Sequence, residues 1–126
     1  EVSHWEAMDA PTEEELYWVY RTNGLEAARQ AVTTSRSKAT SGSLFREDAL
    51  LTISKELSYL GMDKESADFF RLVAFTFPES VTAQLAAAQG LANAGNAVEA
   101  RKLFEHVLKL DSSNQLAKEA LSKTTN

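Results

Sequence analysis

The sequence has no cysteine among its 126 residues, which excludes a disulfide framework and thiolate chemistry. It also has no apolar run near the roughly 20 residues that a membrane-spanning helix requires. With 44% hydrophobic and 25% charged residues, its composition is that of a folded globular chain and not of a disordered one. We therefore expect a soluble protein with no membrane insertion. The compartment stays open, with the cytoplasm favoured.

Lysine and arginine are absent from the first 15 positions, although these positions carry six of the 18 acidic residues. Beyond them, twelve acids and thirteen bases nearly balance, and the net charge of the chain is −5. The chain therefore lacks the stripe of basic residues that binds nucleic acid through counterion release. An anionic membrane surface would also repel the acidic end. We expect neither nucleic acid nor a membrane as a partner.

Motifs for catalysis are missing too, because no GxSxG, P-loop or HExxH pattern occurs. His106 falls beside charged residues on what should be a solvated helix face, without the partner that a general base needs. His4 with Glu6 and Asp9 could imitate a metal-ligand set, but a solvated acidic segment is the simpler interpretation. We predict no enzyme activity, no cofactor and no metal site.

What the sequence does contain is a pair of amphipathic helices in the segment 81–112. Apolar residues recur at helical spacing on both sides of a turn at Gly95 and Asn96. They are Leu85, Ala88, Leu91 and Ala92 before the turn, and Ala100, Leu103, Phe104, Val107 and Leu108 after it. Because one such pair cannot bury its apolar faces alone, it predicts neighbours of the same kind.

The neighbour is a second copy of the pattern, displaced by 34 residues. The shift places Gly61 on Gly95, Leu57 on Leu91, Glu65 on Glu99, Phe70 on Phe104 and Val73 on Val107. A period of 34 with turn, small and aromatic positions in this order resembles the tetratricopeptide repeat (TPR). The resemblance implies an all-α, right-handed helical solenoid of helix-turn-helix repeats with a C-terminal capping helix. Leu50 and Gln84 stand where the family has tryptophan.

On this basis we divide a single domain, residues 1–126, into five segments. They are an irregular lead-in (1–11), a degenerate repeat (12–39), two repeats (44–80 and 81–112) and a capping helix (113–124). Helix starts are predicted at residues whose side chains accept from backbone amides: Thr12, Asp63, Ser80, Asn96 and Ser112. The segment 73–77, VAFTF, alternates like a strand, but the repeat register predicts a helix there. Phe70 and Phe104, at equal repeat positions, are predicted to be buried.

The resemblance also implies a binding surface, because in this family the first helix of each repeat lines the inner, concave face. The matching positions are Lys55, Ser58, Tyr59, Leu85, Gln89, Ala92 and Asn93, with Trp18, Arg21 and Thr22 added from the degenerate repeat. A neutral groove of amides and rings suits an extended peptide or a helix, since amides pair with backbone groups. We predict a non-catalytic module that binds a protein or peptide partner. The alternative, a groove that is only solvated or is covered by another part of the protein, stays open.

Aromatic residues are crowded near the N-terminal end, at Trp5, Tyr17, Trp18 and Tyr20. This is more than one degenerate helix must bury. We expect two of them in the core and the others at a contact with another domain or a peptide.

A second resemblance concerns the order of segments along the chain. The motif GLEAA at 24–28, a polar gap, a helix and two repeats is similar to the repeat tails that follow some bacterial serine-hydrolase and esterase domains. It implies an alternative function, a structural or dimerising C-terminal tail of a larger hydrolase of the esterase or β-lactamase kind. Under this alternative a second copy of the chain is also a candidate partner.

Overall fold

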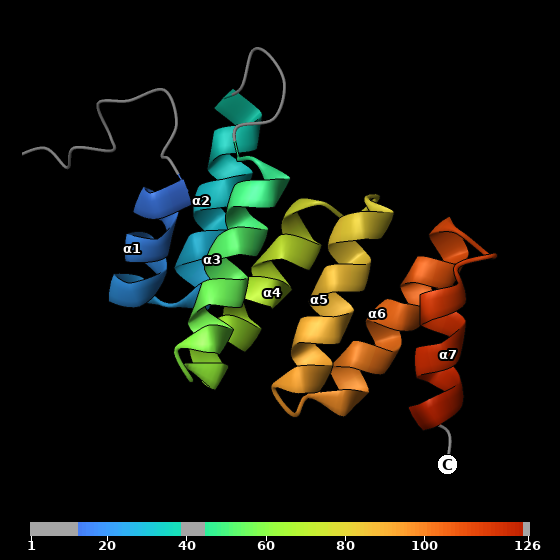
Figure 1. The fold of residues 1–126 in the computed structure, drawn as a ribbon. Coiled ribbons are helices and arrows are strands. Elements are labelled where there is room, and N and C mark those ends of the chain that lie inside the picture. Colours follow the sequence, from blue (N-terminus) through green and yellow to red (C-terminus); the bar gives the residue numbers. More distant parts are fainter. Residues whose placement is uncertain (1–12, 39–44, 125–126) are drawn as a thin grey trace, which may run out of the picture. The chain divides into compact units, whose positions relative to one another are not determined.

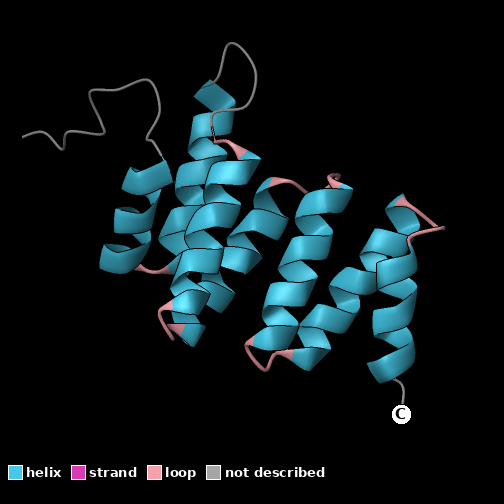
Figure 2. Ribbon diagram, in the orientation of Figure 1, coloured by secondary structure: helices cyan, strands magenta, loops and turns pink. Residues whose placement is uncertain are grey.

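A computed structural model describes residues 13–38 and 45–124 of the protein. These residues form seven α-helices and no strand, as Figure 1 and Figure 2 show. The helices are α1 (Glu13–Asn23), α2 (Leu25–Lys38), α3 (Glu47–Tyr59), α4 (Asp63–Thr76), α5 (Val81–Asn93), α6 (Ala97–Leu110) and α7 (Gln115–Thr124). The all-α prediction is confirmed for this part of the chain. The predicted lead-in, 1–11, lies outside the described residues.

The chain divides into two compact units, Glu1–Leu50 and Leu51–Asn126, and the division falls inside α3. In the first unit, α1 and α2 pack as a hairpin around Gly24, whose φ is 98°. The Gly24 amide donates to the Tyr20 carbonyl at 2.8 Å, so α1 ends in a turn at Gly24. The buried faces of the hairpin meet at Leu16, Tyr20, Ala28 and Val32. The prediction of a single domain with five segments stays a prediction.

The second unit contains two helix-ending turns that repeat each other in detail. At the first, Met62 donates to the Leu57 carbonyl and Gly61 to the Ser58 carbonyl. At the second, Asn96 donates to the Leu91 carbonyl and Gly95 to the Ala92 carbonyl. These are the paired hydrogen bonds of a Schellman motif, and the two sets differ by 34 residues. Gly61 and Gly95 have φ values of 79° and 91°, in a region that favours glycine. The spacing read from the sequence is therefore present in the backbone.

Helix α4 settles the ambiguous segment 73–77, because its helical backbone continues to Thr76. The Thr76 hydroxyl donates to the Leu72 carbonyl at 2.7 Å, a bond that a helical turn provides. At the start of α5, Ser80 accepts from the Ala83 amide at 3.1 Å, as predicted. The helical interpretation is confirmed for residues 73–76, with Phe77 at the C-cap, and the cap at Ser80 is confirmed.

Three predicted caps are wrong, and a fourth is not testable. Asp63 is the first residue of α4, and the residue at the cap position, Met62, makes no side-chain bond. Asn96 occupies the cap position of α6 but also makes none. Helix α7 is capped by Asn114, not Ser112: its side-chain oxygen accepts from the Ala117 amide at 3.0 Å. Thr12 lies outside the described residues.

The displaced start of α7 has a local cause in Asp111. Its carboxylate accepts from the hydroxyl and the amide of Ser113 and from the side chain of Asn114. These hydrogen bonds, that of the Ser113 hydroxyl first, lower the pKa of Asp111. Because the turn around Asp111 takes up the intervening residues, the helix begins two residues later than a cap at Ser112 would allow.

The core of the second unit lies along α5, which packs against both α4 and α6. Ala83, Ala87, Ala88 and Leu91 are buried on α5. Phe70 and Phe104 are 3% and 4% exposed, so their predicted burial is confirmed. Helix α7 packs against α6 and buries Ala117. The small residues of α5 allow its two neighbours to approach closely.

Candidate functional site

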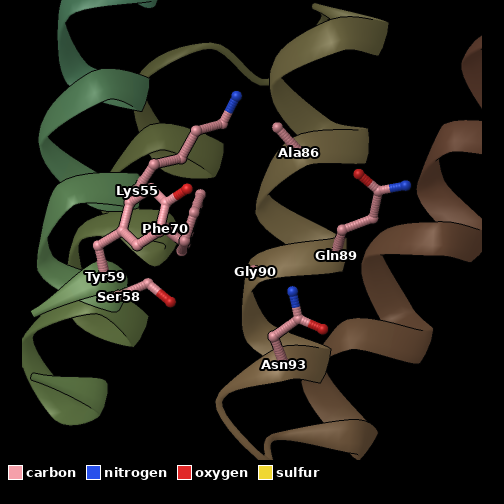
Figure 3. Close-up of a pocket in the computed structure, with 8 residues that line it drawn as sticks. All are labelled: Lys55, Ser58, Tyr59, Phe70, Ala86, Gln89, Gly90 and Asn93. Atoms are coloured by element: carbon pink, nitrogen blue, oxygen red, sulfur yellow. The ribbon is translucent and has the colours of Figure 1, made fainter. Parts of the chain in front are cut away.

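An open pocket of about 440 Å³ lies in the second unit between α3 and α5, with α4 beneath it. Figure 3 shows one wall built from α3 and the facing wall from α5. We call it the α3–α5 groove. Its lining residues are Lys55, Ser58, Tyr59, Phe70, Ala86, Gln89, Gly90 and Asn93.

Helical spacing explains why these residues meet. Lys55, Ser58 and Tyr59 stand at positions i, i+3 and i+4 of α3, which share one helix face. The α5 wall follows the same rule over two turns, at i, i+3, i+4 and i+7. Its four residues are Ala86, Gln89, Gly90 and Asn93. The groove is thus formed where one face of α3 lies opposite one face of α5.

The floor of the groove is apolar and depends on the absence of a side chain at Gly90. The Phe70 ring, from α4, lies directly against Gly90. A Cβ built on Gly90 would overlap three carbon atoms of that ring, which is itself 3% exposed. Real Cβ atoms do not approach so closely, so the ring position requires glycine at 90. A larger residue there would shift the ring and change the floor.

The walls are polar, and a single charge stands among the lining residues, that of Lys55. In Figure 3 Lys55 extends towards the Ala86 end of the groove, while Ser58 and Asn93 lie towards the other end. Within the part of the chain that the structure describes, no internal hydrogen bond or ion pair occupies the side chains of Lys55, Gln89 or Asn93. The Tyr59 side chain is 94% exposed. The polar groups of these side chains and the Tyr59 ring therefore face solvent and are available to a ligand.

Five of the ten predicted site residues come together in the groove: Lys55, Ser58, Tyr59, Gln89 and Asn93. Leu85, which is half-buried on α5, and Ala92, which is exposed on the same helix, do not line the groove. The sequence reasoning missed Phe70 as a lining residue and gave Gly90 no place in the site. A glycine in the middle of a helix was the available signal, because it weakens the helix unless a neighbour needs the space.

The other three predicted residues, Trp18, Arg21 and Thr22, lie on α1 in the first unit. Trp18 is 59% exposed and meets the Tyr17 ring edge to face at a centroid distance of 5.7 Å. The Arg21 guanidinium lies 6.0 Å from the centre of the Tyr17 ring. Tyr20 is buried. The aromatic excess is therefore divided between core and surface on α1, while Trp5 lies outside the described residues.

An ion-pair cluster joins α4 to the first turn of α6. Arg71 donates from Nε and Nη2 to the two carboxylate oxygens of Glu99, at 2.8 and 2.6 Å. It also donates from Nη1 to Asp68 at 2.7 Å. The hydrogen bond with Glu99 raises the pKa of Arg71, and the same bond lowers the pKa of Glu99. Both carboxylate oxygens of Glu99 are therefore occupied by Arg71.

Other candidates for chemistry are few in the described region. Nε2 of His106 lies 2.8 Å from the Pro78 carbonyl oxygen, so a backbone group takes up that nitrogen. Among the described residues, no group of three or more His, Asp or Glu side chains is arranged to hold a metal ion. None of the described helices combines the length and apolar character needed to cross a membrane.

Comparison with known proteins adds no family to these observations. No protein-family model and no curated protein matches the chain. The TPR resemblance therefore rests on the 34-residue spacing and on the helices and turns that follow it.

Proposed function

We propose that the chain is a non-catalytic interaction module of the TPR type, a right-handed solenoid that binds an extended peptide in the α3–α5 groove. The observation that carries the proposal is the composition of that groove. It combines an apolar floor with amide, hydroxyl and ammonium groups that no internal partner occupies. Such a surface offers hydrogen bonds to a peptide backbone and contact area to its side chains.

An extended peptide fits the groove better than a deeply enclosed small molecule does. The pocket is open, and its α5 wall extends over eight residues, from Ala86 to Asn93. Gln89 and Asn93 stand on that wall one helical turn apart, and each amide both donates and accepts. Tyr59 contributes a large ring with few rotamers to immobilise, which favours it as a contact residue.

The test is a peptide-library selection on the full chain, followed by affinity measurement on the selected peptides. Tyr59→Ala combined with Asn93→Ala should weaken binding at least tenfold, because it removes the ring and one amide of the groove. Leu60→Ala is the matched control, since Leu60 is 72% exposed, follows Tyr59 directly and does not line the groove. Circular dichroism melts should show that both variants stay folded.

Selected peptides that bind the double variant as well as the wild type would refute the groove as the binding site. A library that yields no binder at all would refute peptide binding. The alternative role, a structural or dimerising tail of a larger hydrolase, stays a prediction that rests on the segment order alone.

A further inference from the structure

The apolar floor restricts what part of a peptide can lie at the centre of the groove. The Phe70 ring and the bare backbone of Gly90 form that centre, with Ala86 beside them on α5. None of these groups has a side-chain hydrogen-bond donor or acceptor. A polar ligand group placed on them would lose its water and gain no partner, which is costly. A large apolar side chain would lose no hydrogen bonds to water there and would bury apolar surface.

The single charge restricts the peptide at one end. Lys55 is positive, and the lining residues include no carboxylate to neutralise it. Glu56, the next residue on α3, is not part of the lining. The groove is therefore locally positive on a chain whose net charge is −5. A carboxylate near Lys55 gains Coulomb energy, whereas a second cation there is repelled.

Helix geometry sets the distance between these two features. Lys55 reaches towards Ala86, and the apolar centre lies at Gly90, four residues further along α5. Four residues correspond to about 6 Å along a helix axis. An extended peptide advances roughly 6.6–6.8 Å over two residues, and side chains two apart point to the same side. Both features are therefore reached by peptide positions i and i+2.

We infer that the groove selects extended peptides in which an acidic and a large apolar side chain alternate with one residue between them. The inference rests on the proposed function and names the ligand class of the same site. The apolar side chain lies on Phe70 and Gly90, and the carboxylate pairs with Lys55. The two amides of the α5 wall, Gln89 and Asn93, bond to the peptide backbone and do not select any side chain of the peptide.

The experiment is an NMR titration of the ¹⁵N-labelled full chain with short capped peptides. The two parent probes are acetyl-Gly-Glu-Ser-Phe-Gly-Ser-amide and the peptide with Glu and Phe exchanged, which covers both chain directions. In the better binder, replacing Phe by Ala should weaken binding at least tenfold, because an aromatic side chain leaves the floor. Replacing Glu by Gln should weaken it about threefold at low salt, as for an exposed ion pair. A peptide with Glu and Phe adjacent should also bind more weakly.

The variant Lys55→Met tests whether the peptide carboxylate pairs with Lys55. In this variant the Glu and Gln peptides should bind equally, while the difference between Phe and Ala remains. Lys109→Met is the matched control, because Lys109 is exposed on α6 and does not line the groove. In this control, both the difference between the Glu and Gln peptides and the difference between the Phe and Ala peptides should remain. The advantage of Glu over Gln should also disappear at 0.5 M salt, where screening is strong.

The inference and the proposed function fail in different ways. If neither parent probe binds, or if Phe→Ala and Glu→Gln in the probes change nothing, the inferred ligand class is overturned. The proposed function survives that result as long as library-selected peptides still bind and still depend on Tyr59 and Asn93. If the selected peptides ignore those two residues, the groove itself is refuted.

Discussion

At the scale of single residues, Gln84 shows how a departure from the repeat pattern acquires a structural role. It is 2% exposed, and its side-chain amide donates to the carbonyls of Ala74 and Phe77, at 2.9 and 3.1 Å. The last carbonyls of a helix have no partner within the helix, and here Gln84 supplies one to the end of α4. Where the TPR pattern has a tryptophan, this chain closes the preceding helix with an amide.

Gln84→Leu should therefore lower the free energy of unfolding by about 1–2 kcal/mol, because the Ala74 carbonyl loses the donor that Gln84 supplies, while the Phe77 carbonyl keeps only the bond from the Ser80 amide. The measurement is a urea titration followed by circular dichroism. Gln89→Leu is the control, since Gln89 is an exposed glutamine on the same helix. It should change the free energy by no more than about 0.5 kcal/mol. Equal effects of the two substitutions would contradict the role assigned to Gln84.

The contact of Gly90 with Phe70 gives a second prediction at this scale. Gly90→Ala places a methyl group inside the space of the Phe70 ring, and we expect a loss of about 1–3 kcal/mol from overpacking. Alanine is otherwise the better helix former by about 1 kcal/mol, so a loss has to come from the clash. Urea titrations of Gly90→Ala, Phe70→Leu and the double variant form a cycle. The double variant should lose less than the sum of the two single ones; strict additivity would show that the two residues do not interact.

At the scale of helices and turns, the ion pair between Arg71 on α4 and Glu99 on α6 makes stability depend on pH. The folded state lowers the pKa of Glu99 below its ordinary value of 4.5, chiefly through the hydrogen bond with Arg71. The folded state thus binds fewer protons here than the unfolded one. The stabilisation by Glu99 is present above pH 4.5 and is lost as the pH falls through the lowered value.

Glu99→Gln should cost about 1 kcal/mol at pH 7, a value kept small by solvent screening because the Glu99 side chain is 46% exposed. The difference from wild type should shrink as the pH falls from 7 to 3, as measured by urea titration at each pH. Glu105→Gln is the matched control, since Glu105 pairs at 3.4 Å with Arg101 of its own helix. Its effect should be smaller. A difference for Glu99→Gln that is constant across this range would contradict the assignment.

The helices and turns also show what the sequence could predict and why some details escaped it. Glycine at 61 and 95 predicts the turns correctly, because the backbone there needs a positive φ. The same turns explain why the caps predicted at Asp63 and Asn96 are wrong. Met62 and Asn96 have nearly equal backbone angles, with ψ of 70° and 66°, whereas Ser80, which does cap its helix, has ψ of 115°. The turn fixes a backbone conformation that differs from the extended one of a capping residue.

At the scale of the molecule, stability should not be uniform along the second unit. Helix α5 packs against α4 and α6, whereas α7 packs mainly against α6 and exposes 53% of Leu116. Amide hydrogens of α7 should therefore exchange with deuterium well before those of α5, because an end element opens without disturbing the rest. Exchange followed by mass spectrometry or NMR measures this directly. Equal protection of the two helices would show that α7 opens only with the whole unit.

The candidate site was only partly predictable, for a physical reason. The resemblance to the TPR pattern implied residues 55, 59, 89 and 93, because in that pattern the first helix of each repeat lines one face. The floor does not follow from it. Phe70 lies on the second helix of its repeat, and a buried aromatic looks the same in sequence whether or not a groove opens above it. Only the packing of Phe70 on Gly90 shows that this residue both fills the core and forms the floor of the groove.

The bond between His106 and the Pro78 carbonyl makes the imidazole a natural spectroscopic probe. A carbonyl oxygen only accepts hydrogen bonds, so Nε2 carries the proton, and the neutral ring is then the tautomer with an unprotonated Nδ1. The chain has only two histidines, so its imidazole ¹⁵N spectrum should be simple to assign. A shift of the His106 signals would report release of the α4–α5 loop from α6, with ¹⁵N enrichment as the only labelling.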